Sequence, residues 1–474
     1  MTLALEPSEP SVLRPLLRLA VPIVLANLLQ TGYQITDAFW VGRLGAAAVA
    51  AVSVSFPVTF LMIALGGGLA VAGATLTAQY AGARDQAMVD HVAAQTMIMV
   101  VGTSMVLGSV GVALAPLILK AIGVAPEVYA EALGFLRVSF VGLIFVFAFA
   151  MSQALMRGVG RAVAPLAIVA GTVVLNFALD PLLIFGWSPV PAFGVMGAAL
   201  ATLGTQGLAT LAAIVLLWRG TYGIRVTPAG LKPDLAYIRR AFRLGFPASI
   251  ELSARAVGLI VLSFLVTSFG TVTLAAYGIG ANVLQVVTIP ALGLSTAAAA
   301  LVGQSIGAGQ VERAARTTRL AGALGFMVLT LVGIAAAAAA PAIVGFFVSG
   351  DPAVVAEGGR FIRIMAPAWG FIALQLTIVS TFRAAGTMVA AMVLALVSQW
   401  VLQFPLAYVL SRPQVLGTAG LWWSFPVTNV LTALAAVGLY LRGDWTTMRL
   451  TGTVPAGTAQ VIVEAITEDG LPRV

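Results

Sequence analysis

The strongest constraint on this chain is a set of long stretches without a single charged residue. Three of them run from Leu44 to Ala83, from Pro181 to Trp218 and from Ala256 to Val311. A bilayer core needs only ~20 apolar residues in a helix, so the last stretch is long enough for two crossings and a turn. Of all residues, 60% are hydrophobic and 9% are charged, which is not the balance of a soluble domain. We therefore predict an all-α integral membrane protein in a lipid bilayer.

Hydropathy divides the chain into twelve predicted transmembrane helices. Their limits are 15–41, 46–79, 92–119, 128–156, 161–186, 193–218, 240–268, 272–303, 317–348, 355–382, 386–411 and 416–441. They form two six-helix lobes, over residues 1–218 and 240–442, joined by a linker over residues 219–239. We expect the linker to permit the lobes to move, and the tail over residues 443–474 to be poorly ordered.

Most of the 25 basic residues lie in predicted loops on one face of the membrane, and this assignment includes Arg157 and Arg383. The positive-inside rule then places this face and both termini in the cytoplasm. The same loops account for the pI of about 10.3, so we expect no nucleic-acid partner.

The two halves of the chain resemble each other at a nearly constant offset. Arg18-Leu-Ala-Val-Pro22 recurs as Arg243-Leu-Gly-Phe-Pro247, and Gln79-Tyr-Ala-Gly82 recurs as Gln304-Ser-Ile-Gly307, each 225 residues later. Because each repeat holds six spans, the second starts on the same side of the membrane as the first. The lobes are therefore predicted to be a parallel repeat, related by an axis along the membrane normal.

Three acidic residues lie well inside predicted spans: Asp37, Asp180 and Glu251. A carboxylate at the bilayer centre costs about 2.5–3.5 kcal/mol on insertion scales, and such residues usually serve ions, protons or ligands. The repeat partner of Asp37 is Leu262, and the segment that corresponds to Asp180 lacks the acid. The pair of carboxylates thus belongs to the first lobe alone.

Asn176 precedes Asp180 by one helical turn, so the two side chains share a face. Together with Asp37 they offer two carboxylates and an amide oxygen. Oxygen ligands suit a hard cation such as sodium, whereas two neighbouring carboxylates would share one proton. The residues alone leave both alternatives open.

Other polar residues of the spans have a structural and a functional interpretation. Glu251 has Arg255 four residues later, the favoured order for an ion pair within a helix. Gln34, Gln153 and Thr202 have two interpretations: the functional one is that they line a cavity, and the structural one is that they hydrogen-bond neighbouring helices. Pro22 removes a backbone hydrogen bond inside the first span and favours a bend there.

Several motifs occur in order that resemble the MATE (multidrug and toxic compound extrusion) transporters, and most closely the DinF-like branch. They are Gln30-Thr-Gly-Tyr-Gln-Ile-Thr-Asp37, Val41-Gly-Arg-Leu-Gly45, Arg157-Gly-Val-Gly160, Asn176 with Asp180-Pro181, and Gly194-Val-Met-Gly-Ala-Ala-Leu-Ala-Thr202. The resemblance implies a proton or cation site at Asp37, Asn176, Asp180 and Thr202, with Tyr33 in its network and a helix bend at Pro22. Glu251 resembles a seventh-helix acid of other branches, but the tenth-helix acid of their second cation site has no counterpart within the tenth span here.

The resemblance implies a cation-coupled antiporter, not an enzyme, in the plasma membrane of a prokaryote. It would export small organic, often cationic compounds by alternating access, with a proton or sodium as the coupling ion and no cofactor. The alternative is a flippase of lipid-linked precursors, for which Arg255 is a candidate contact to an anionic substrate. We expect a monomer.

Overall fold

The computed structural model describes residues 11–348, 350–447 and 450–451. Within these residues the chain holds twelve helical segments that are long and apolar enough to cross a membrane. The first six are α1 (Leu13–Gly42), α2 (Ala46–Gly82), α3 (Gln86–Ile122), α4 (Pro126–Gly158), α5 (Val163–Phe185) and α6 (Val195–Trp218). A short 3₁₀ turn, η1 (Pro228–Leu231), lies in the linker.

The second half repeats this order with more interruptions. Its elements are α7 (Leu235–Thr267), α8 (Thr271–Gly307), α9 (Val311–Ala338), α10 (Ala340–Phe347), α11 (Pro352–Met365), η2 (Ala366–Ala368), α12 (Trp369–Ala385), α13 (Met388–Leu396), η3 (Val397–Gln403), α14 (Phe404–Leu410), α15 (Thr418–Arg442) and η4 (Asp444–Thr446). α11 and α12 together make the tenth span, and α13 and α14 make the eleventh around a π-helical turn, η3. The predicted fold class is confirmed.

Backbone angles show the internal repeat directly. Gly45 and Gly270, which precede α2 and α8, have φ values of 110° and 95°. Gly194 and Gly417, which precede α6 and α15, have φ values of 57° and 59°. Residues with a Cβ rarely adopt such values, so glycine recurs where the second half repeats these turns.

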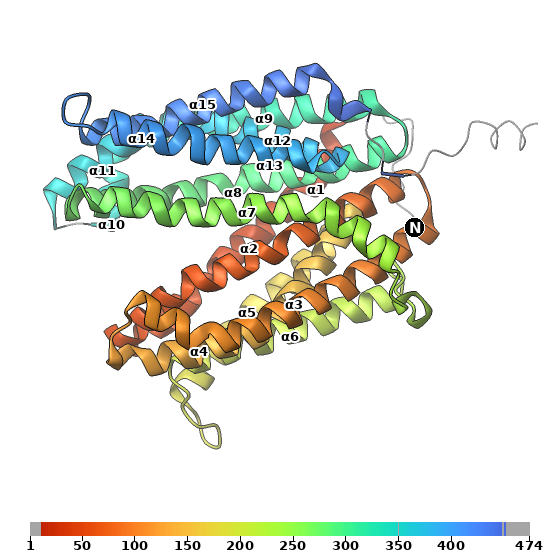
Figure 1. Ribbon diagram of the computed structural model, residues 1–474, viewed down its shortest axis with the longest axis horizontal. Helices are drawn as coiled ribbons and strands as arrows, with labels where there is room; N and C mark the ends of the chain where they lie inside the picture. The colour runs from red at the N-terminus through yellow and green to blue at the C-terminus, as the bar shows by residue number, and fades with distance from the viewer. Residues whose placement is uncertain (1–10, 349, 448–449, 452–474) are drawn as a thin grey trace, which may run out of the picture.

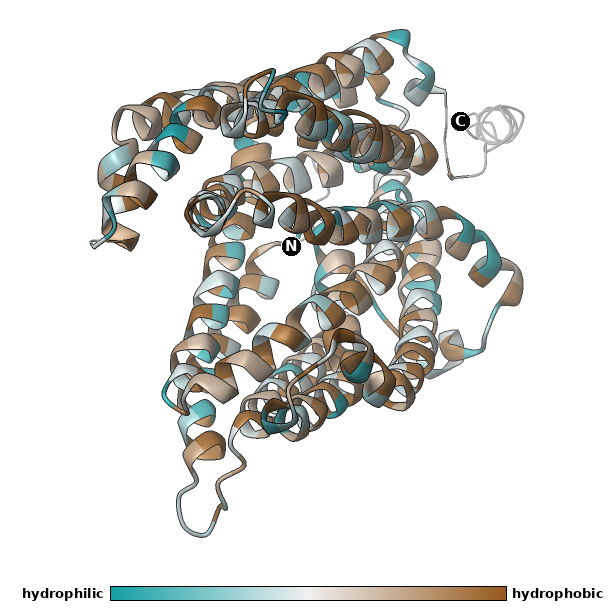
Figure 2. Ribbon diagram, turned by 60° about the vertical axis from the view of Figure 1, so that its left-hand side comes forward, coloured by the Kyte–Doolittle hydropathy of each residue, from teal (hydrophilic) through white to brown (hydrophobic). Residues whose placement is uncertain are grey.

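The two lobes form a V. The ribbons of α1–α6 and α7–α15 come together towards the right of Figure 1, where α2 and α8 end and the linker lies, and they diverge towards the left. We call these the linker end and the open end. In Figure 2 the hydrophilic segments gather mainly at the ends of the helices and in the connections, as a bilayer environment requires. Each lobe has its own core, built around Phe140 and Leu136 in one and around Trp369 and Trp422 in the other.

The linker is hydrogen-bonded to the first lobe. Gln95 of α3 is fully buried, and its amide donates to the carbonyl oxygens of Gly230 and Lys232 at 2.9 and 2.7 Å. It also accepts from the backbone N–H of Asp234 at 2.9 Å. Asp234 caps α7 by accepting the N–H of Tyr237, which lowers the pKa of the Asp234 carboxyl. In this structure the linker is therefore bonded to the first lobe up to the start of α7.

The first residues of the tail are also packed. Trp445 is buried and donates its indole N–H to the carbonyl oxygen of Tyr440 at 3.1 Å, and Leu450 packs against the first lobe. This part of the tail therefore departs from the expected disorder. Residues 448–449 and 452–474 of the tail lie outside the described residues.

Candidate functional site

The candidate site lies where α1 packs against α5 and α6. Asn176 and Asp180 of α5 are fully buried, and the Asn176 amide Nδ2 donates to Asp180 Oδ1 at 3.0 Å. The Asp37 side chain of α1 lies next to those of Asp180, Asn176 and Thr202. The structure thus brings together the four residues that the sequence assigned to the coupling ion. α1 is distant in the chain from the consecutive helices α5 and α6, so the site depends on how these three helices pack together.

Three oxygen atoms of this cluster have no hydrogen-bond donor among the described residues. They are Asp37 Oδ1, Asn176 Oδ1 and Asp180 Oδ2, and each is buried. A buried acceptor without a donor is destabilising by about 1–3 kcal/mol, and more when it is charged. A shared proton between the carboxyls, or a cation among the three oxygens, would satisfy them. This arrangement is suited to a small positive ion and not to an anion.

Tyr33 extends the cluster towards α6. Its hydroxyl donates to Thr202 Oγ1 at 3.1 Å and lies 3.0 Å from Thr205 Oγ1. Thr205 was missed by the sequence analysis, although it follows Thr202 by three residues and so shares its face of the helix. Because Tyr33 precedes Asp37 by one turn, these hydrogen bonds fix the rotation of α1 beside the carboxylates.

The other predicted residues of the first lobe lie elsewhere. Gln34 is exposed, and Gln153 accepts a hydrogen bond from Arg157 at 3.2 Å. The structure therefore shows neither of them in contact with the carboxylate cluster. Pro22 lies within α1, which runs as one helix from Leu13 to Gly42.

Glu251 of the second lobe is a different kind of acid. It is fully buried and bonds Arg255 at 3.1 Å, as expected, but it is also held by Arg383 of α12 at 2.5 and 3.2 Å. The assignment of Arg383 to a loop was therefore wrong. Two guanidinium groups occupy both carboxylate oxygens and leave a net positive charge, so this cluster does not provide a second cation site.

Apolar residues occupy the positions of the second lobe that correspond to the carboxylate pair. Leu262 corresponds to Asp37 and is buried, and Ala407 stands at the position of Asp180, also buried. Gln403, the partner of Asn176, donates to Ser424 Oγ at 3.0 Å. The predicted chemical difference between the lobes is thus visible in the packing.

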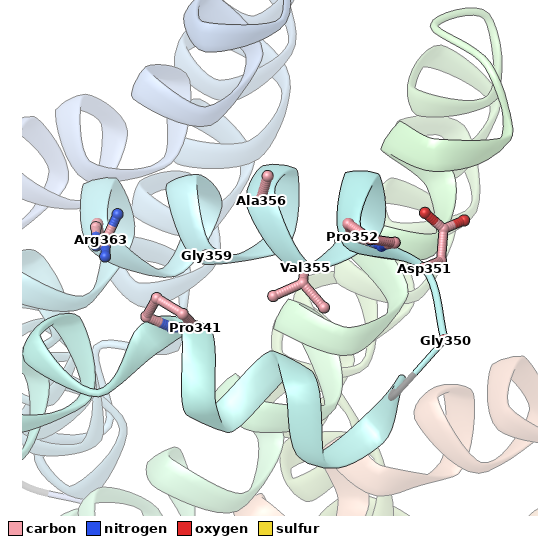
Figure 3. A pocket seen from close by; sticks show the side chains of 8 residues that line it. All are labelled: Pro341, Gly350, Asp351, Pro352, Val355, Ala356, Gly359 and Arg363. Carbon is pink, nitrogen blue, oxygen red and sulfur yellow. The ribbon is translucent and has the colours of Figure 1, made fainter.

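A cavity of about 340 Å³ lies between α10 and α11 (Figure 3). Asp351 and Arg363 are its charged lining residues, and Asp351 Oδ1 already accepts the N–H groups of Ala353 and Val354 at the start of α11. Its lining comes entirely from the second lobe and includes none of the predicted site residues.

Comparison with known proteins gives consistent results. A family model described as MatE matches residues 22–182 and 247–409. The chain is 27% identical over 447 residues to the probable multidrug resistance protein YpnP of Bacillus subtilis (strain 168), covering 94% of this chain and 98% of that protein. Two crystal structures, described as MATE in the bent and in the straight conformation, share the fold with a TM-score of 0.85 each. Both are 23% identical in sequence and align with 92% of this chain and with 95% and 96% of theirs.

Proposed function

The chain belongs to the MATE family, whose members are transporters and not enzymes, and we propose that it is a cation-coupled multidrug antiporter. In this proposal it exports small organic, often cationic compounds in exchange for a proton or a sodium ion. The drug-resistance name of the YpnP relative supports the substrate class. The protein would act in the plasma membrane of a prokaryote, with the linker end and both termini in the cytoplasm.

The observation that carries the proposal is the group of buried oxygens without donors at Asp37, Asn176 and Asp180. A neutralised and an ionised pair differ strongly in how well they tolerate burial. Entry of a proton or sodium ion would therefore favour the packing of α1 against α5 in which these oxygens lie together. Loss of the ion would leave two carboxylates in repulsion and loosen that packing.

Coupling follows if the two packings of α1 belong to different states of the V. An ion shifts such an equilibrium only through its different affinity for the two states. The arrangement described here, closed at the linker end, corresponds to the outward-open state of this scheme. The ion would arrive from outside and bias α1, and the bias would favour release of the drug to the outside. Pro22 is the proposed point of bending, because the carbonyl oxygen one turn earlier has no N–H partner there.

The experiment is efflux of a cationic dye from proteoliposomes under a proton gradient and, separately, under a sodium gradient. We expect Asp37→Asn to reduce gradient-driven efflux about 5- to 150-fold, as loss of 1–3 kcal/mol of coupling predicts. Asp351→Asn is the matched control, because Asp351 is exposed and asparagine caps a helix equally well. Equal efflux by the wild type and Asp37→Asn under both gradients would contradict the proposal.

The net positive charge of the Glu251 cluster is the observation that favours the flippase alternative. That alternative predicts no dye movement under either gradient and transfer of a fluorescent anionic lipid between leaflets. Measuring both probes in the same liposomes separates the two functions.

A further inference from the structure

Two glutamines join the lobes at the linker end by matching hydrogen bonds. Gln79 of α2 donates its Nε2 to the carbonyl oxygen of Ala384 in the second lobe at 2.7 Å. Gln304 of α8 donates its Nε2 to the carbonyl oxygen of Gly158 in the first lobe at 2.8 Å. Gln79 and Gln304 are repeat partners, 225 residues apart, and the two acceptors are 226 residues apart. Each lobe therefore donates one such hydrogen bond to a carbonyl oxygen of the other lobe.

The backbone of each glutamine also lies directly against a glycine of the opposite lobe. A Cβ on Gly82 would collide with the backbone of Gln304, and a Cβ on Gly307 would collide with the backbone of Gln79. Each glycine follows its own glutamine by three residues, so the motif supplies both the donor and the space for its partner. Glycine at this crossing leaves room for the ends of α2 and α8 to approach closely, as small residues do at helix contacts in membranes.

Both polar atoms of the Gln79 side-chain amide make hydrogen bonds. Its Oε1 accepts the backbone N–H of Leu450 at 2.9 Å, and the carbonyl oxygen of Leu450 accepts from Arg240 of α7 at 2.5 Å. The start of the tail therefore lies across the contact and bonds both lobes. Thr75 adds a further bond between the lobes, from its Oγ1 to the carbonyl oxygen of Arg383 at 3.2 Å.

We propose that Gln79 and Gln304 are positioning residues that hold the linker end closed and thereby set the balance between the two states of transport. The pair, with Gly82 and Gly307, is called the glutamine clasp. Opening at this end would break both interlobe bonds together, because each glutamine bonds the opposite lobe. The role in transport rests on the alternating access proposed above, whereas the closure itself does not.

The chain contains no cysteine, so labels can be placed at will. Ala83 and Ala308 are exposed residues at the ends of α2 and α8, and Ala83→Cys with Ala308→Cys gives a spin-label pair across the clasp. Pulsed electron paramagnetic resonance on the purified full chain then measures the fraction of molecules open at this end, without substrate or gradient.

We expect Gln79→Ala and Gln304→Ala each to raise the open-to-closed ratio about two- to ten-fold, the effect of one net hydrogen bond, and the double variant to raise it further. Gln86→Ala is the matched control. Gln86 is exposed near the same end of the molecule and donates to Gly223 and Asp90, and none of these bonds joins the lobes. An unchanged distance distribution in the double variant, or an equal change in Gln86→Ala, would overturn the proposal.

A second pair of variants tests the proposal even if the glutamine variants fail to fold. Gly82→Ala forces the crossing apart and is expected to favour the open state, whereas Gly102→Ala places its methyl group in free space and is expected to change nothing. Since these measurements need no transport, they separate failure of the clasp from failure of the antiport proposal. Dye efflux by the same variants then reports whether the closure limits transport.

Discussion

The three acids inside the membrane differ in how their oxygen atoms are occupied. Asp37 and Asp180 each have a buried oxygen without a donor, and they lie beside each other. Glu251 has both oxygens bonded by arginine side chains. In the proposed function the first two acids, which each keep one acceptor oxygen without a donor, take up and release the ion, and Glu251, whose oxygens are both bonded, does not.

This contrast predicts different effects of neutralising each acid. We expect Asp180→Asn to abolish gradient-driven efflux with little loss of stability. Glu251→Gln should leave more efflux but destabilise the fold by about 1–3 kcal/mol. This range is the cost of weakening charge-assisted hydrogen bonds from Arg255 and Arg383. Thermal unfolding and proteoliposome efflux of both variants test this, and equal loss of efflux in the two would contradict the dominance of the first lobe.

Sequence reasoning found the central residues of the site because a buried acid is rare in a membrane helix. It missed Arg383, because a basic residue at the end of a span was counted with the loops, although its long side chain reaches back to α7. It missed Thr205 because a single threonine carries no signal until Tyr33 is known to lie beside it. Both omissions concern partners that only the packing of different helices reveals.

At the scale of elements, the twelve spans were predicted closely and their ends less so. α3 begins at Gln86 and α7 at Leu235, several residues before the predicted spans, because hydropathy marks only the apolar part of a helix. The polar starts are fixed by Asp85 and Asp234, which cap the two helices. The breaks at η2 and η3 were not predicted, because hydropathy does not report backbone geometry.

Bending of α1 at Pro22 can be tested by substitution. Pro22→Ala restores a backbone donor inside the helix and should stiffen it. We expect dye efflux to fall several-fold while the ion site stays intact, because Asp37 is four helical turns away. Protection against thermal unfolding by the coupling ion reports the site separately. Pro116→Ala in α3 is the control, a proline that is also inside a helix, and an equal effect of the two substitutions would rule out a special role for Pro22.

At the scale of the whole molecule, two lobes share one backbone plan but not one chemistry. Matching glycines and turns recur in both halves, and each half supplies one glutamine and one glycine to the glutamine clasp, while the carboxylate pair is replaced by Leu262 and Ala407 in the second half. The number of spans, the two lobes and their repeat were all predictable, because they follow from hydropathy and spacing. The sequence did not predict which end of the molecule is closed, because closure depends on contacts such as that of Gln79 with Ala384.

Ion coupling at the first lobe predicts that binding of a drug displaces the ion from the Asp37–Asp180 pair. The measurement is proton release, in a weakly buffered solution with a pH dye, when a cationic substrate is added to the purified protein, repeated as displacement of radioactive sodium. We predict release of one of the two ions by the wild type and by Asp351→Asn, and none by Asp180→Asn. Release of the same size by Asp180→Asn, or release of neither ion by the wild type, would contradict the assignment of coupling to the Asp37–Asp180 pair.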